Sequence, residues 1–158
     1  MSIAPRILYV DDDPDGRELM FCRLTQGHGF ELTTAADGSH ARKSIEQEFF
    51  DLYLLDYCLP DTTATSLCSQ IKLFNPDAPI IVYSALDREI DRKLALEAGA
   101  TLYFIKPEQI ELMVSEIGRM LSRRTAGPPK PQWPASGHSS FVIPQQQVHV
   151  RRKASGIV

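Results

Sequence analysis

Six polar side chains follow directly after short apolar runs, and together they can carry out phosphoryl chemistry. They are a triplet of acids, a further acid, a hydroxyl and an amine: Asp11, Asp12, Asp13, Asp56, Ser84 and Lys106. Carboxylates brought to one place repel each other unless a cation offsets their charge. Mg²⁺ binds carboxylate and phosphate oxygens, and an ammonium can bind another phosphoryl oxygen. The set therefore predicts a Mg²⁺-assisted phosphoryl site with a carboxylate nucleophile.

The apolar runs that precede these residues have the pattern of buried parallel strands. Three of the five runs are almost wholly apolar, which is typical of strands covered on both faces. The runs are Arg6–Val10, Glu31–Ala35, Leu52–Leu55, Ile80–Tyr83 and Leu102–Ile105. Helical patterns follow them over Asp15–Thr25, Ser39–Glu48, Thr63–Phe74, Asp87–Glu97 and Glu108–Ser122. This alternation predicts an open, doubly wound α/β sheet, in which ligands bind beyond the carboxyl ends of the strands.

The composition excludes several other classes of protein. A hydrophobic fraction of 43% over 158 residues can form a core. No apolar stretch approaches the roughly 20 residues of a membrane span, and no signal-peptide pattern is found, so we expect no membrane association and a cytoplasmic location. The three cysteines lack metal-ligand spacing, and we expect Cys22 and Cys68 to be core residues.

Charge divides the chain into two parts. Residues 1–121 hold 11 basic and 20 acidic residues, a net charge of −9, whereas residues 122–158 hold six basic residues and no acid. The second part also contains five of the 11 prolines. We predict a folded domain over residues 1–122 and a Pro-rich basic tail over 123–158. The acidic body argues against direct nucleic acid binding by the domain.

The chemistry-bearing stretches, taken together, resemble the receiver domain of two-component response regulators, in the CheY-like superfamily. The resemblance covers residues 5 to about 122 and rests on Ile7–Pro14, Leu54–Pro60, Tyr83–Ala85, Glu97–Ala100 and Tyr103–Pro107. It implies a flavodoxin-like five-stranded parallel sheet in the order 2-1-3-4-5, with helices on both faces. It also implies a signalling switch rather than an enzyme, with only self-catalysed phosphoryl transfer and hydrolysis.

The resemblance assigns a role to each acid at the site. Asp56 resembles the phosphoacceptor, which takes its phosphoryl group from a sensor histidine kinase or a phosphotransfer protein. Asp12 resembles the direct Mg²⁺ ligand, and Asp11 an acid that acts largely through metal-bound water. The carboxylate of Asp56 and the backbone carbonyl of Cys58 correspond to further metal ligands.

The remaining site residues correspond to the phosphoryl contact and the switch. Lys106 resembles the family lysine that contacts the phosphoryl group, and its bond to Pro107 is expected to be cis. Ser84 and Tyr103 resemble the switch pair. Phosphorylation is expected to draw the Ser84 hydroxyl inward, to let Tyr103 follow, and so to alter the surface over residues 87–122 for an output partner.

The loop after Asp56 departs from the family pattern. Ala64 stands where glycine is usual, so we expect a different loop path if that position needs a positive φ. Cys58 and Leu86, two residues after Asp56 and Ser84, are not the long polar groups that tune hydrolysis in the family. The lifetime of the phosphorylated form is therefore not set by this resemblance.

A hydrolase is the alternative interpretation. Asp11–Asp13 has the D-x-D form of haloacid dehalogenase-like phosphatases, in which Asp11 would be the nucleophile. That class needs an acidic pair after its lysine, and here Glu108, Glu111 and Glu116 are instead spread along a predicted helix.

Overall fold

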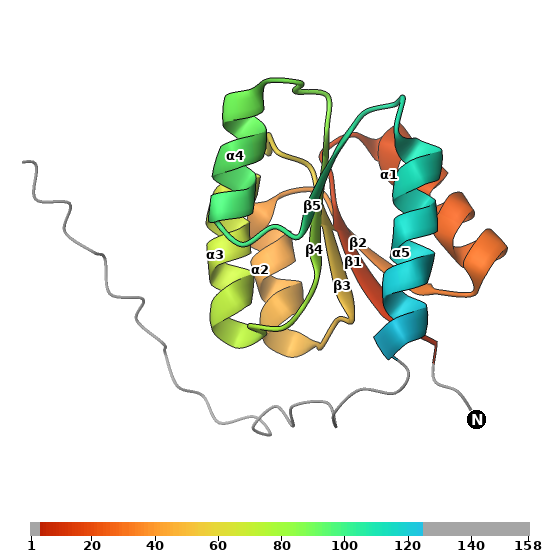
Figure 1. Cartoon of the computed structure of the whole chain (residues 1–158). Helices are drawn as coiled ribbons and strands as arrows, with labels where there is room; N and C mark the ends of the chain where they lie inside the picture. Colours follow the sequence, from red (N-terminus) through yellow and green to blue (C-terminus); the bar gives the residue numbers. More distant parts are fainter. Residues whose placement is uncertain (1–3, 125–158) are drawn as a thin grey trace, which may run out of the picture. The chain divides into compact units, whose positions relative to one another are not determined.

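A computed structural model describes residues 4–124, and residues 1–3 and 125–158 lie outside the described part. The five strands are parallel and form one sheet in the order β2-β1-β3-β4-β5 (Figure 1). Their bounds are β1 Arg6–Val10, β2 Glu31–Ala35, β3 Leu52–Leu55, β4 Ile80–Ser84 and β5 Leu102–Ile105. The expected strand order is confirmed. The predicted Pro-rich tail lies outside the described residues, apart from its first two positions, which end the last helix.

Helices cover both faces of the sheet, as the doubly wound prediction requires. Helices α2, α3 and α4 lie on one face, and α1 and α5 lie on the other (Figure 1). Their bounds are α1 Pro14–Phe21, α2 Gly38–Gln47, α3 Ala64–Phe74, α4 Glu89–Glu97 and α5 Ile110–Arg124, and a π-helical turn, η1 Cys22–Gln26, follows α1. This turn and α1 together fill the predicted Asp15–Thr25 segment.

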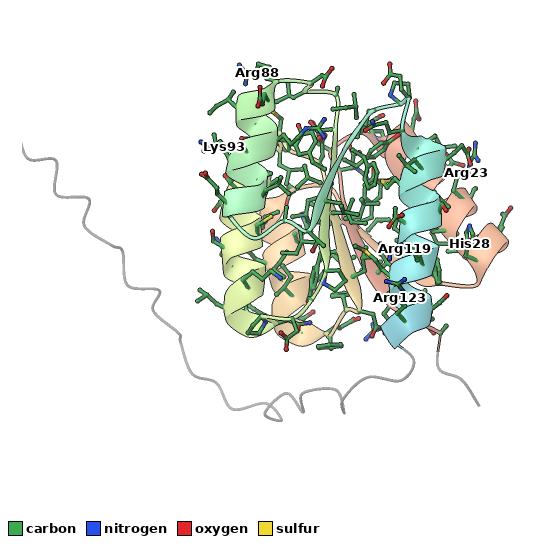
Figure 2. All side chains as sticks on the ribbon, in the orientation of Figure 1. Arg23, His28, Arg88, Lys93, Arg119 and Arg123 are labelled. Carbon is green, nitrogen blue, oxygen red and sulfur yellow. The ribbon has the colours of Figure 1, made fainter. Side chains whose placement is uncertain are left out.

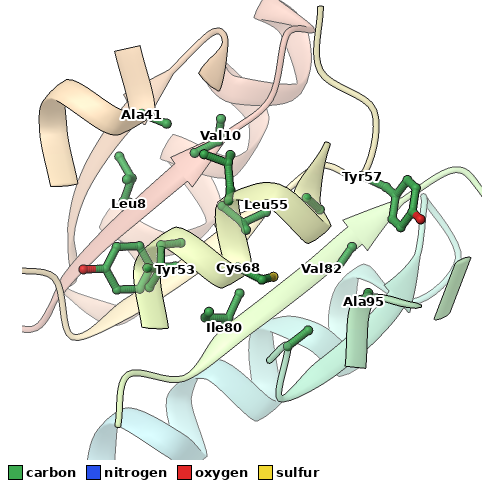
Figure 3. Close-up of a cluster of buried hydrophobic side chains, with 14 of the residues drawn as sticks. Leu8, Val10, Ala41, Tyr53, Leu55, Tyr57, Cys68, Ile80, Val82 and Ala95 are labelled. Carbon is green, nitrogen blue, oxygen red and sulfur yellow. The ribbon is translucent and has the colours of Figure 1, made fainter. Parts of the chain in front are cut away.

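Strand alternation places the core in two layers, one on each face of the sheet. Leu8, Tyr53 and Val82 point toward α2, α3 and α4, in the cluster shown in Figure 3. Ile7, Tyr9 and Leu54 point to the opposite face and pack with residues of α1 and α5. Both layers are almost fully buried, which explains why the strand sequences are apolar at consecutive positions.

The helix boundaries follow local capping chemistry. The Asp13 side chain accepts hydrogen bonds from the backbone of the first turn of α1, where Pro14 is the first residue, so Asp13 caps this helix. Gly99, just after α4, has φ +114°, and an added Cβ there would lie 3.0 Å from Lys72.

One conditional expectation does not apply, and one expectation needs correction. Ala64 is the first residue of α3, and none of the non-glycine residues 4–124 has a positive φ, so alanine fits there without strain. Cys68 is buried as expected, but Cys22 is exposed, because α1 and η1 turn Met20 and Leu24 toward the core instead.

None of the helices within residues 4–124 has the length and apolar character of a membrane span.

Candidate functional site

Backbone hydrogen bonds fix the residues that follow β1, β3 and β5 at one edge of the sheet. The amide of Asp11 donates to the carbonyl of Ala35 at 3.0 Å, and the amide of Asp56 donates to the carbonyl of Val10 at 2.8 Å. Between β5 and β4, the amide of Lys106 donates to the carbonyl of Ser84 at 2.9 Å. These bonds continue the parallel pairing past the last residues of β1, β3 and β5, so the side chains after those strands share one site.

Three carboxylates form the centre of this site. One oxygen each from Asp11, Asp12 and Asp56 lies within 4.8 Å of the others. Asp11 is buried, with 1% of its surface exposed, Asp56 is half-buried, and Asp12 is open to solvent. Such a set of hard oxygen donors with like charge fits a divalent cation such as Mg²⁺, with Asp12 on the accessible side. Asp13 is not in this group because its carboxylate caps α1.

Lys106 supplies the positive charge between two of these carboxylates. Its Nζ lies 2.5 Å from Oδ2 of Asp11 and 3.2 Å from Oδ2 of Asp56. Burial by itself would lower the pKa of Lys106, but the hydrogen bonds and charges of Asp11 and Asp56 outweigh burial and raise that pKa. The lysine is therefore held as an ammonium, the form that can bind a phosphoryl oxygen.

One oxygen of the Asp56 carboxylate is fixed by the backbone. The amide of Tyr57 donates to Oδ1 of Asp56 at 2.7 Å. Burial raises the pKa of the Asp56 carboxyl, with Asp11 adding to the effect, although Lys106 and the Tyr57 amide pull the pKa down. Cys58 is exposed and forms an isolated bridge to Thr63 in the loop that follows. The metal role of the Cys58 carbonyl stays a prediction.

The predicted switch pair lies beside the same edge of the sheet. Ser84 is buried, and its Oγ accepts a hydrogen bond from the amide of Leu86 at 3.2 Å. The Tyr103 hydroxyl donates to the carbonyl of Leu86 at 2.7 Å, and only 6% of Tyr103 is exposed. Tyr103 therefore already has the inward position that the sequence analysis expects only after phosphorylation. The expected cis bond between Lys106 and Pro107 is confirmed.

A buried acid that no sequence pattern predicts lies where the loop after Asp56 meets α4. Asp91, 4% exposed, receives two hydrogen bonds from the Arg88 guanidinium, at 2.6 and 3.0 Å. Burial raises the pKa of Tyr57, the residue after Asp56, and the nearby Asp91 carboxylate adds to the effect. The Tyr57 ring lies 6.3 Å from that of Tyr103. Arg88 itself stands at the start of α4 (Figure 2). No motif marks Asp91, because an acid in a first helical turn usually faces solvent.

Tyr9 is a second residue that the sequence analysis did not connect with the site. Its buried hydroxyl donates a hydrogen bond to Oδ2 of Asp11. The signal available in the sequence is their spacing, because residues two apart along a strand point to the same side.

The arrangement gives no support to a phosphatase that uses Asp11 as its nucleophile. Asp11 is the most enclosed acid of the three, and its oxygens accept hydrogen bonds from Tyr9, from Lys106 and from the amide of Asp13. A carboxylate so engaged is poorly placed to attack a substrate, whereas Asp56 is more accessible.

Comparisons with known proteins agree with this geometry. Residues 7–118 match the family model described as the response regulator receiver domain. The chain is 35% identical over 124 residues to the transcriptional regulatory protein PrrA of Mycobacterium tuberculosis, a match that covers 77% of this chain and 52% of PrrA. It is 33% identical to the DNA-binding response regulator MtrA of Mycolicibacterium smegmatis, covering 80% of this chain and 55% of MtrA. The chain thus spans about half the length of these curated relatives.

A solved structure shows the same fold. The BeF3-activated N-terminal receiver domain of RstA from Klebsiella pneumoniae superposes with a TM-score of 0.68 at 28% identity, covering 73% of this chain and 97% of that one.

Proposed function

This chain belongs to the response regulator receiver domain family, and from that premise we propose that it is a phosphorylation-dependent switch that accepts a phosphoryl group on Asp56. The observation that carries the proposal is the shared site of Asp11, Asp12, Asp56 and Lys106 at the carboxyl edge of the sheet. A nucleophilic carboxylate, a cation-binding acid pair and an ammonium are the parts that phosphoryl transfer needs.

In the proposed reaction, an oxygen of Asp56 forms a bond to phosphorus and the bond from phosphorus to the donor nitrogen breaks. The donor is a phosphohistidine on a sensor histidine kinase or a phosphotransfer protein, and its imidazole leaves. Lys106, 3.2 Å from the acceptor carboxylate, is positioned to bind a transferred phosphoryl oxygen. Mg²⁺, held by Asp12 and Asp56 with Asp11 nearby, would offset the negative charge of the carboxylates and the phosphoryl group.

A mass measurement with a small phosphodonor tests the acceptor. We expect the wild-type chain to gain the mass of one phosphoryl group from acetyl phosphate, and only when Mg²⁺ is present. Asp56→Asn should gain nothing. Asp77→Asn, which changes an exposed loop acid in the same way, is the matched control and should behave like wild type. Equal uptake by Asp56→Asn would remove Asp56 as the acceptor.

The metal assignment has a separate test in thermal unfolding. Bound Mg²⁺ should raise the midpoint of the wild-type chain, because it binds the folded state and relieves like-charge repulsion. Asp12→Ala should remove that shift, and Asp77→Ala should keep it. If Asp12→Ala retains the full shift, the cation binds elsewhere.

For the output of the switch we propose the surface over residues 87–122, which includes the start of α4 and the exposed side chains Ile90, Leu94 and Leu112. Because Tyr103 is already inward, we expect phosphorylation to act first on Ser84 and on the β4–α4 segment that it contacts through Leu86. Pull-down with the Asp56-phosphorylated chain, compared with Asp56→Asn, would test for a partner that distinguishes the two forms.

A further inference from the structure

Tyr9 brings a hydroxyl into a layer of the core that is otherwise apolar around it. It lies in β1, on the sheet face covered by α1 and α5, among Ile7, Met20, Leu24 and Leu54. Only 1% of its surface is exposed. A buried phenol that lacked a hydrogen-bond partner would be costly, so the partner that it does have is informative.

That partner is the most enclosed carboxylate of the candidate metal site. Strand alternation carries Tyr9 and Asp11 to the same side of the sheet, and the Tyr9 hydroxyl donates to Oδ2 of Asp11. Two further donors hold the same carboxylate. Lys106 Nζ also lies on Oδ2, at 2.5 Å, and the amide of Asp13 donates to Oδ1 at 3.0 Å.

From this geometry we infer that Tyr9 is a positioning residue for the metal site, whose hydroxyl fixes the Asp11 carboxylate in the orientation that Mg²⁺ binding requires. The inference rests on the proposed function and deepens it, because it adds a residue that acts through Asp11 and does not itself touch the cation or the phosphoryl group.

The three donors to Asp11 differ in whether they keep their hydrogen bond once Asp56 carries a phosphoryl group. Lys106 is shared with Asp56, and a phosphoryl group on Asp56 offers the ammonium new oxygens to bind. The Asp13 amide is fixed by the backbone but holds only Oδ1. Tyr9 is therefore the donor that stays on Oδ2 when Lys106 turns to the phosphoryl group.

A neutral hydroxyl suits this role better than a second cation would. It orients the carboxylate and stabilises its negative charge without adding a positive charge that would repel Mg²⁺. An ordinary phenol is protonated at neutral pH, and the Tyr9 hydroxyl donates to Asp11 in the structure. Groups that hydrogen-bond a metal ligand in this way commonly affect metal affinity by about 10- to 100-fold.

The test is Tyr9→Phe, which removes the hydroxyl and keeps the ring in the core. The matched control is Tyr53→Phe, because Tyr53 is equally buried but lies on the other face of the sheet, in the other core cluster. Titration calorimetry would measure the dissociation constant for Mg²⁺, and acetyl phosphate uptake would be followed as a function of Mg²⁺ concentration. Circular dichroism would confirm that each variant is folded.

We expect Tyr9→Phe to raise the Mg²⁺ dissociation constant by about tenfold. The half-saturating Mg²⁺ concentration for phosphorylation should rise by the same factor, and the rate at saturating Mg²⁺ should stay within about twofold of wild type. Tyr53→Phe should leave both Mg²⁺ constants unchanged. In an Asp11→Asn background, Tyr9→Phe should have little further effect on Mg²⁺ affinity, because the two residues act as one unit.

The outcomes separate this inference from the proposed function. If wild type binds Mg²⁺ and takes up phosphate but Tyr9→Phe has the same Mg²⁺ constants, the inference is wrong and the proposed function stands. The same holds if Tyr9→Phe lowers only the thermal midpoint, since Tyr9 is then a packing residue. If the wild-type chain neither binds Mg²⁺ nor accepts phosphate, both fail together.

Discussion

Lys106 and Asp11 form an ion pair of 2.5 Å between groups that are 95 residues apart in the sequence. The Asp11 side chain is 1% exposed and that of Lys106 is 21% exposed, so the pair is largely shielded from solvent. Together with Asp12 and Asp56, the site holds three carboxylates around one ammonium. Lys106 is thus the positive charge that limits the repulsion within the cluster.

Lys106→Met should therefore make the protein depend more strongly on Mg²⁺. Without Mg²⁺ we expect the free energy of unfolding to fall by about 2 kcal/mol, because two charge-assisted hydrogen bonds are lost. Mg²⁺ should restore much of the lost stability, so Mg²⁺ should raise the thermal midpoint of Lys106→Met by more than it raises that of wild type. Phosphate uptake by Lys106→Met should fall sharply. Lys93→Met, at an exposed position of α4, is the control and should leave the Mg²⁺ shift unchanged. A Mg²⁺ shift in Lys106→Met no larger than that of wild type would contradict the role given to the ammonium.

Asp56→Asn should stabilise the protein, and the gain should depend on pH. Burial, which outweighs the attraction of Lys106, raises the pKa of the Asp56 carboxyl, so the folded state disfavours its ionised form. Wild type therefore loses stability as pH rises through that pKa, and the amide, which cannot ionise, does not. Urea unfolding from about pH 3 to pH 7 without Mg²⁺ would measure the free energy of unfolding of both chains. The two values should converge in acid, and that of Asp56→Asn should be the higher near neutral pH. If Asp56→Asn is more stable than wild type by the same amount at every pH, ionisation of Asp56 is not the cause of the difference.

The strands and the acid cluster could be predicted because local signals determine them. Polar residues directly follow four of the five apolar runs. Four of the five predicted strands have the observed bounds, and β4 is longer by Ser84 alone. The carboxyl ends of parallel strands then meet at one edge, which brings Asp11, Asp12 and Asp56 together whatever the details of packing.

The contacts that the sequence did not predict depend on side chains from separate elements. Asp91 can be buried because the Arg88 guanidinium satisfies its carboxylate with two hydrogen bonds, and no motif marks this partner. The inward position of Tyr103 depends on the Leu86 carbonyl and on packing against Tyr57. Such contacts follow from tertiary packing, which neither propensity nor spacing specifies.

The buried Asp91 carboxylate, which lies beside Arg88 and Tyr57, should contribute measurably to stability. Asp91→Ala leaves the Arg88 guanidinium without its bidentate partner, so we expect a loss of about 1–3 kcal/mol in the free energy of unfolding. Asp87→Ala, at an exposed acid of the preceding loop, should change the free energy of unfolding by less than about 0.5 kcal/mol. Denaturant unfolding of the single variants Asp91→Ala and Tyr57→Phe and of the double variant would measure their coupling. Additive losses in this cycle would mean that Tyr57 and Asp91 do not stabilise each other.

A chain shortened to residues 1–124 should fold and accept phosphate without the Pro-rich basic tail. The family match ends at residue 118, and within residues 4–124 the buried residues of the two core clusters run from Ile7 to Leu121. The charge changes from −9 over residues 1–121 to +6 over 122–158, so the tail can be attracted to the acidic body. Exposed ion pairs are worth at most about 1 kcal/mol each and weaken with salt, however, so this attraction should not determine folding.

We expect the shortened chain to unfold cooperatively, with a midpoint close to that of the full chain in high salt, and to take up one phosphoryl group on Asp56. The full chain with Arg151, Arg152 and Lys153 changed to Gln is the control that removes charge but keeps length. A shortened chain that fails to fold, beside a control that folds normally, would show that tail residues complete the core and that the proposed boundary near residue 122 is wrong.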